Sequence, residues 1–217
     1  SMRYPKEHKE QTRTLLLESG GSHAKKHGFV ASGMDSLSAA AGVTTGSLYK
    51  HFEGKSDLFA ALIRAELQRT AQRFSAIAPD DPEAAAKALA AYLSLNHVKH
   101  PEAGCALPSL TPEVARADES VRDAFQSGVL AIHAIVVDRF TGSADTAWAL
   151  IAQSVGAVML ARAMPDERVR RELLGAMAIV CVAAASIYWL GPAAVFLPII
   201  VGGFAGFFYF AFTQRFT

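Results

Sequence analysis

The segment Ala39–Phe52, AAAGVTTGSLYKHF, decides how the amino-terminal part of the chain folds. A run of alanines ends at Gly42, and Thr44 follows, where its hydroxyl can accept a free backbone N–H in the first turn of a new helix. The sequence therefore predicts a short helix over Met34–Ala41, a tight turn, and a second short helix over Thr45–Phe52. Two short helices joined by a turn that contains glycine form a helix-turn-helix unit.

The second short helix has an inward and an outward side. Leu48 and Phe52 are four residues apart, so they share the face that packs into the core. The first residues are small, which lets the backbone approach base edges in a DNA groove, and a tyrosine, a lysine and a histidine follow that can reach phosphates and bases. The pattern fits a DNA-reading helix, and it also fits a plain helical hairpin with a polar surface turn.

Composition limits the remaining possibilities. The 217 residues carry a net charge of +1, so affinity for DNA or a membrane must come from a local patch. Residues 1–57 hold eight Lys/Arg against six Asp/Glu, a slight excess. Cys105 and Cys181 are the only cysteines, which fits a reducing cytosol without disulfides. No catalytic triad or phosphate-binding loop is visible, so we expect no enzyme and no cofactor.

Apolar residues recur at helical spacing and do not alternate with period two, which predicts an all-α chain. A first helix is expected from Lys6 or Glu10 to His27, weakened by Gly20 and Gly21. Ser56 is expected to cap a long helix, and Pro112 to open a short one. Further helices are expected from Pro82, over Glu119–Phe140, over Ala144–Met164, and from Asp166.

The stretch Met34–Ile63, MDSLSAAAGVTTGSLYKHFEGKSDLFAALI, strongly resembles the DNA-binding segment of TetR-type (tetracycline-repressor-like) bacterial regulators. The shared signature is Ala-Gly-Val, a polar pair, Gly-x-Leu-Tyr-x-His-Phe, and a lysine three residues before a leucine. His100–Phe125, HPEAGCALPSLTPEVARADESVRDAF, is similar to the regulatory half of one TetR subgroup, and the resemblance extends to about Ala176. His23-Ala24 and Gly20-Gly21 depart from the family's usual Leu-Phe and Ala-Ala in the first helix.

This resemblance implies a ligand-responsive repressor that acts as a homodimer on a palindromic stretch of double-stranded DNA. It implies a three-helix helix-turn-helix domain over residues 6–57 and a helical domain for ligand binding and dimerisation over residues 58–172. The expected DNA-contacting residues are Thr44, Thr45, Gly46, Ser47, Tyr49, Lys50, His51 and Lys55. The residues expected near the pocket of a small-molecule effector are Tyr92, His97, Cys105, Phe125, His133 and Trp148.

Two further expectations concern this regulatory half. His97, His100 and Cys105 match no structural zinc spacing, so we expect no metal site. The expected dimerisation helix is Ala144–Met164, where small residues permit close helix approach. A twofold dimer would place its two reading helices about one DNA turn apart, roughly 34–36 Å.

Residues 173–214 carry no charge, and this run divides at Gly191-Pro192. Leu173–Leu190 and Ala193–Phe212 are each long enough to cross a bilayer, and arginines flank the run at both ends. One interpretation is a membrane hairpin that tethers a cytoplasmic regulator to the inner membrane. The alternatives are an extension of the dimer interface or an altered reading frame. A different functional hypothesis is a membrane-tethered helical module that binds a protein partner and has lost DNA binding.

Overall fold

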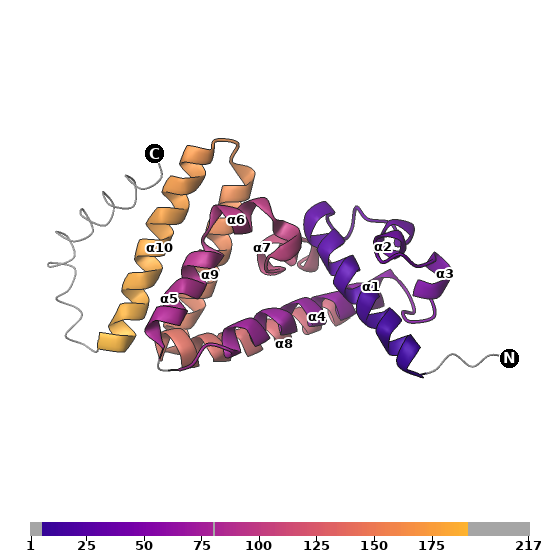
Figure 1. Cartoon of the computed structure of the whole chain (residues 1–217), viewed down its shortest axis with the longest axis horizontal. Helices are drawn as coiled ribbons and strands as arrows, with labels where there is room; N and C mark the ends of the chain where they lie inside the picture. Colours follow the sequence, from indigo (N-terminus) through magenta and orange to yellow (C-terminus); the bar gives the residue numbers. More distant parts are fainter. Residues whose placement is uncertain (1–5, 80, 191–217) are drawn as a thin grey trace.

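The computed structural model describes residues 6–79 and 81–190, and in these residues the chain is helical and contains no strand. Helices α1–α3 form a compact unit at one end of an elongated molecule, and α5, α6, α9 and α10 gather at the other end (Figure 1). The long helices α4 and α8 lie side by side and connect the two ends (Figure 1). The all-α prediction is therefore confirmed.

The amino-terminal unit consists of α1 (Lys6–His27), α2 (Met34–Ala40) and α3 (Thr45–Leu48). Leu16, Leu37 and Leu48 meet in its core, and each is almost completely buried. Gly42 forms the turn between α2 and α3 at a φ of 67°, a left-handed conformation that favours glycine. The predicted pair of short helices and its tight turn are thus present.

Helix α4 (Lys55–Ser75) ties this unit to the rest of the chain. Leu58 and Leu62 are buried near its start, and Phe59 stacks on Phe29 with ring centroids 4.1 Å apart. Further along, the buried Leu67 lies where α4 packs against α8 (Glu119–Val136). One helix therefore belongs to both ends of the molecule, because its first turns pack against α1 and its later turns pack against α8.

The carboxy-terminal helices build the second end. In chain order they are α5 (Pro82–Tyr92), α6 (Leu95–Lys99), the 3₁₀ turn η1 (Pro101–Ala103), α7 (Leu107–Val114), α8, the π-helical turn η2 (Val137–Thr141), α9 (Ala144–Ala163) and α10 (Glu167–Leu190). Helix α10 packs along α9 and forms the outer layer of this end (Figure 1). Leu174 and Cys181 of α10 are buried, and the Cys181 Sγ lies 3.8 Å from the Ser154 Oγ of α9.

Several predicted helix boundaries were wrong. The helix α3 ends at Leu48 and not at Phe52, although the Phe52 N–H still donates to the Leu48 carbonyl at 3.1 Å. Gly54, not Ser56, precedes α4, and the Asp57 carboxylate accepts the Glu53 N–H at 3.0 Å across this helix start. Pro112 lies inside α7 and does not open a helix. The helix predicted over Glu119–Phe140 continues beyond α8 as the π-helical turn.

The charge-free run is described in part. Leu173–Leu190 belongs to α10, while the Gly191-Pro192 break and the second half of the predicted hairpin lie outside the described residues. Among the described helices, one is long and apolar enough to cross a membrane by length and composition, and that helix is α9. Helix α9 packs against α6, α7, α8 and α10, so its apolar composition is weak evidence for a membrane span.

Candidate functional site

Polar side chains fix α3 against α2. The Thr44 Oγ1 accepts the Ser47 N–H at 3.2 Å and so caps the start of α3, as the sequence predicts. The Thr45 hydroxyl donates to Asp35 Oδ1 at 2.5 Å, and its oxygen lies 3.1 Å from the Ser38 hydroxyl. Both Asp35 and Ser38 belong to α2, so these bonds set the angle between the two short helices.

All eight predicted DNA-contacting residues are exposed or half-buried. Leu48 and Phe52 are buried beneath them, whereas Tyr49 is 54 % exposed. A Cβ added at Gly46 would contact nothing, so the backbone is open to an incoming surface there. The exposed members are Thr44, Gly46, Tyr49 and Lys50, and the half-buried members are Thr45, Ser47, His51 and Lys55. We call these eight residues the reading surface.

Lys55 has an intramolecular partner in this structure. Its Nζ donates to the Val30 carbonyl at 2.9 Å and lies 5.4 Å from the centre of the Phe29 ring. An ammonium group has three donors, so one bond to Val30 leaves two for a phosphate. The predicted phosphate contact therefore fits a lysine whose position the α1–α2 turn already fixes.

Sequence reasoning missed two cations beside the reading surface. Burial lowers the pKa of His51, and the nearby positive charges of Lys9, Arg13 and Lys50 lower it further. Arg13 also lies over the Phe52 ring, 5.3 Å from its centre. Lys9 and Arg13 belong to α1, and the first helix contained no motif that would have singled them out. The reading surface therefore lies in a cationic environment that the small net charge conceals.

A cavity with a volume of about 40 Å³ lies among α4, α5, α7, α8 and α9 and is partly open to solvent. Two of the predicted pocket residues, Tyr92 and Cys105, line it. The lining that sequence reasoning missed is Thr70, Phe74, Leu89, Leu107, Ile132, Val136, Phe140, Leu150, Ile151, Ser154 and Val155. These residues come from distant parts of the chain, and no local pattern marks them.

His97 does not line the cavity but is hydrogen-bonded to the backbone of two residues that do. Its Nε2 accepts the Cys105 N–H at 3.1 Å, so its Nδ1 carries the proton and donates to the Tyr92 carbonyl at 2.7 Å. Burial lowers the pKa of His97, and the Arg162 guanidinium, bonded to the His97 carbonyl at 2.9 Å, lowers it further. A neutral imidazole thus connects the two cavity residues that the sequence predicted.

The other predicted pocket residues lie elsewhere. His133 stacks on Trp148 with ring centroids 4.2 Å apart, and its Nε2 lies 2.9 Å from the Ala144 carbonyl oxygen. Phe125 packs against the core from α8 without lining the cavity. The part of the chain that the structure describes holds no group of three or more His, Cys, Asp or Glu residues placed for a metal ion.

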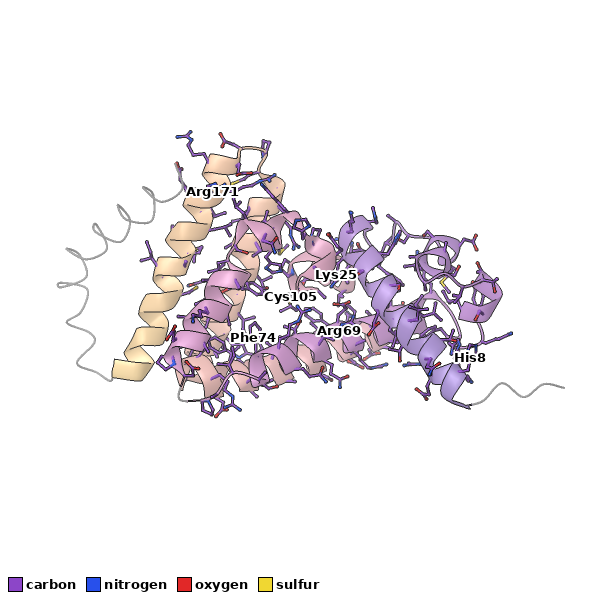
Figure 2. All side chains as sticks on the ribbon, in the orientation of Figure 1. His8, Lys25, Arg69, Phe74, Cys105 and Arg171 are labelled. Carbon is purple, nitrogen blue, oxygen red and sulfur yellow. The ribbon has the colours of Figure 1, made fainter. Side chains whose placement is uncertain are left out.

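The segment of residues 101–114 lies between the cavity and α1. The Ser22 hydroxyl donates to the Glu102 carbonyl at 3.1 Å, and the Lys25 Nζ donates to the Gly104 carbonyl at 2.9 Å. Figure 2 shows Lys25 and Cys105 close to this junction, where α1 meets the middle of the molecule. Leu107, which lines the cavity, belongs to the same segment. A single stretch of chain therefore contacts both the cavity and the amino-terminal unit.

The far end of the same segment holds the α1–α2 turn. The Glu113 carboxylate accepts the Phe29 N–H at 3.2 Å and the Val30 N–H at 2.6 Å. Val30 in turn presents its carbonyl to Lys55 of the reading surface. A continuous set of contacts thus leads from the cavity wall to a predicted phosphate-binding lysine. We call residues 101–114 the coupling segment.

The comparisons agree with this geometry. A family model described as bacterial regulatory proteins, tetR family, matches residues 22–62, which include the end of α1, all of α2 and α3, and the start of α4. Residues 22–62 are thus similar to the tetR family of bacterial regulatory proteins, and the match covers the amino-terminal unit only. The matched region contains the reading surface. No curated protein matches the sequence.

Several solved structures share the fold of most of this chain. A regulator from Agrobacterium tumefaciens has a TM-score of 0.64 at 19 % identity, with 79 % of this chain and 98 % of that chain covered. Escherichia coli NemR in its reduced form has a TM-score of 0.63 at 22 % identity, with 79 % and 95 % covered. The regulatory protein TetR from Rhodobacter sphaeroides has a TM-score of 0.62 at 20 % identity, with 79 % and 97 % covered. The chain thus contains nearly the full fold of each of these neighbours.

Proposed function

We propose that the protein is a ligand-responsive repressor that binds a palindromic DNA operator as a homodimer in the cytoplasm. The observation that carries this proposal is the outward surface of α3, whose exposed residues are the DNA-contacting positions implied by the resemblance and lie near the cations of α1. In the proposed complex, the small residues at the start of α3 approach base edges, and Lys50 and Lys55 bind phosphates.

A surface suitable for dimerisation lies at the other end of the molecule. Trp148 and Leu160 of α9 are 42 % and 55 % exposed, and Ile179 and Val180 of α10 are 48 % and 47 % exposed. Exposed large apolar side chains on two helices that pack together favour contact with another protein surface. We assign this surface to a second copy of the chain, with α10 joining the predicted helix α9 in the interface.

The proposed response to ligand uses the coupling segment. A ligand in the cavity would contact Cys105 and Leu107, and the same segment holds α1 through Gly104 and the α1–α2 turn through Glu113. If the ligand binds more tightly when the reading surfaces are misaligned, it weakens DNA binding by that difference in affinity. The DNA in turn weakens ligand binding by the same factor.

Selection of bound fragments from random DNA by the full-length protein tests the proposal. The expected product is a palindrome whose half-sites are centred about 34–36 Å apart, one turn of DNA. A single half-site would contradict the homodimer, and an absence of any enriched sequence would contradict the proposed function. The selected site then serves as the DNA probe in the experiments below.

Replacing Lys50 by alanine is expected to weaken binding to specific and non-specific DNA by similar factors. Lys50 is exposed on the reading surface, so its ammonium can neutralise a phosphate without reading a base. The slope of log affinity against log salt should fall by about 1, as expected for one lost phosphate contact.

Thr45→Ser is expected instead to change the preference among DNA sequences. It keeps the hydroxyl bonded to Asp35 and removes a methyl that can contact thymine. A Thr45→Ser variant with unchanged sequence preference, or a Lys50→Ala variant with altered preference, would contradict these roles.

DNA binding is expected to strengthen as the pH falls from 7.5 toward 6. The pKa of His51 lies below its ordinary value in the free protein, because burial and neighbouring cations disfavour the charged ring. A nearby phosphate favours the charged ring and raises this pKa, so binding takes up a proton in that pH range. Fluorescence anisotropy titrations at constant salt measure the effect. The His51→Gln variant should lose most of this pH dependence, and a variant that keeps all of it would refute the assignment.

A further inference from the structure

The polar atoms that line the cavity differ in whether they have a hydrogen-bond partner. The Thr70 hydroxyl has the Glu66 carbonyl as an acceptor at 3.1 Å, and the Cys105 Sγ accepts the Leu107 N–H at 3.5 Å. The Ser154 hydroxyl lies beside the Cys181 sulfur. The Tyr92 hydroxyl is buried beside the Cys105 thiol, a weak acceptor, and has no hydrogen bond of good geometry among the described residues. Leaving a buried hydroxyl unpaired is costly, so this one favours an incoming acceptor.

The cavity wall is electrically neutral. Its described lining is apolar apart from hydroxyls and one thiol, and it includes no Asp, Glu, Lys, Arg or His. Burial raises the pKa of the Tyr92 phenol well above its ordinary value, and burial also raises the pKa of the Cys105 thiol, so both stay uncharged. An ion that entered this space would lose its hydration without gaining a counter-ion from the wall.

Two cations, Arg162 and Lys25, lie near Tyr92 and Cys105. The Lys25 Nζ binds the Glu66 carboxylate and the Gly104 carbonyl. Two of the three Arg162 guanidinium nitrogens are engaged, and the buried Nε has no hydrogen-bond partner among the described residues. One guanidinium nitrogen donates to the His97 carbonyl at 2.9 Å, and another donates to the Ser109 hydroxyl at 2.8 Å. Because Arg162 does not line the cavity, its charge does not replace the hydration that an anionic ligand would lose there, which disfavours such a ligand.

We infer that the effector is an uncharged, largely apolar small molecule with one hydrogen-bond acceptor, and that the Tyr92 hydroxyl donates to this acceptor. The inference rests on the proposed ligand response and specifies its chemistry. The apolar wall supplies affinity by burying the body of the ligand, and Tyr92 supplies selectivity between an acceptor and a hydrocarbon of equal shape. Tyr92 is therefore a specificity-determining residue of the cavity.

Three probes of nearly equal shape separate the contribution of the Tyr92 hydrogen bond from those of apolar burial and ligand charge. Acetophenone has a carbonyl acceptor, α-methylstyrene has a methylene in its place, and benzoate has a negative charge. Calorimetric titration of the full-length protein without DNA measures their affinities. The Tyr92→Phe variant removes one oxygen from the cavity wall. Ser127→Ala is the matched control, because it removes an exposed hydroxyl on α8 that does not line the cavity.

Tyr92→Phe is expected to weaken acetophenone about fivefold, as for one neutral hydrogen bond, and to leave α-methylstyrene within about twofold. Ser127→Ala should change neither probe, and benzoate should bind the unaltered protein at least about tenfold more weakly than acetophenone. If Tyr92→Phe lowered the affinities for acetophenone and α-methylstyrene equally, the proposed hydrogen bond from Tyr92 would be contradicted. Benzoate binding as tight as that of acetophenone, or no binding of either neutral probe, would overturn the inferred ligand class. Thermal unfolding of each variant confirms that it is folded.

A separate measurement distinguishes failure of this inference from failure of the proposed function. Binding of the selected DNA site is measured with and without acetophenone. Acetophenone binding through Tyr92 without any change in DNA affinity supports the ligand chemistry and contradicts the ligand response. Specific DNA binding by a protein that takes up neither neutral probe supports the DNA-binding function and overturns the inferred ligand class.

Discussion

Replacing Glu66 by glutamine is expected to lower the free energy of unfolding by about 3 kcal/mol, the largest stability change predicted for a single side chain. The Glu66 carboxylate is buried, and one of its oxygens lies 2.9 Å from the Nζ of Lys25, which is also buried. Its other oxygen binds the Arg69 guanidinium. Glutamine has a similar shape but no charge, so the Lys25 ammonium would stay buried without its counter-ion. Figure 2 shows Lys25 and Arg69 on the two helices, α1 and α4, that this cluster joins.

The exposed pair Glu83–Lys87 provides the control. Its charged atoms are 2.7 Å apart, a similar distance, but both side chains are more than 70 % exposed. Glu83→Gln should therefore change the free energy of unfolding by less than about 0.5 kcal/mol. Urea unfolding followed by circular dichroism measures both variants. A Glu66→Gln variant no less stable than Glu83→Gln would mean that Gly104 and solvent compensate Lys25.

A double variant separates charge from packing. Replacing both Lys25 and Glu66 by methionine removes the two buried charges together and keeps apolar volume at the α1–α4 contact. Substitution of a whole buried ion pair by apolar residues is often neutral or stabilising, whereas loss of one partner is costly. The double variant is therefore expected to be more stable than Glu66→Gln. If it is less stable, the hydrogen bonds of this cluster contribute more than the burial of its charges costs.

The helix-turn-helix could be predicted from the sequence because local interactions define it. Gly42 adopts a left-handed conformation that glycine reaches without steric cost, and Thr44 caps α3 through a residue three positions later. The spacing of Leu48 and Phe52 places both in the core. The resemblance to TetR-type regulators rests on these same residues, and both lines of reasoning agree.

Contacts between distant helices explain two features that the sequence did not predict, the glycine at position 21 in α1 and the proline at position 112 inside α7. Gly21 weakens α1 on helix propensity alone, but a Cβ at this position would clash with the Glu66 carboxylate, so the glycine makes room for the buried ion cluster. Pro112 remains within α7, where Leu110 and Val114 pack into the core on either side of it. Both residues have local preferences that the packing of distant helices overrides.

The reading surface and the cavity also differ in how far local sequence defines them. The reading surface comes from one continuous stretch, so a motif could locate nearly all of it. The cavity is assembled from five helices, and Thr70, Leu89 and Ser154 meet there although they are far apart in sequence. Tyr92 and Cys105 were predicted through the resemblance, while the stacked pair of His133 and Trp148 lies away from the cavity.

Replacing Glu113 by alanine is expected to weaken specific DNA binding about tenfold, which corresponds to about 1.4 kcal/mol. Its carboxylate holds two consecutive N–H groups of the α1–α2 turn, and charged acceptors of this kind contribute about 1.5–3 kcal/mol each when buried. Val30 is exposed, so water replaces part of this contribution, and the expected loss is correspondingly smaller. The turn would then hold Lys55 less firmly, because the Val30 carbonyl is the acceptor of the Lys55 Nζ.

Glu119→Ala is the control for charge. Glu119 is an exposed acidic residue in the first turn of α8, so its removal changes the net charge by the same amount without touching the turn. Loss of an acidic charge alone should leave DNA affinity unchanged or strengthen it slightly. Fluorescence anisotropy with the selected DNA site compares the two variants. Equal affinities for Glu113→Ala and Glu119→Ala would show that the carboxylate does not position the reading surface.

A double-mutant cycle tests whether the coupling segment acts as a unit. Leu107→Ala enlarges the cavity at one end of α7, and Glu113→Ala releases the turn near the other end. If α7 transmits displacement between these points, the double variant should lose less DNA affinity than the sum of the single losses, by at least about 0.5 kcal/mol. Once Glu113 is gone, a shift of α7 at the cavity no longer moves the α1–α2 turn. Strictly additive losses would instead require ligand and DNA to communicate by another route, such as α4, which packs against both ends of the molecule.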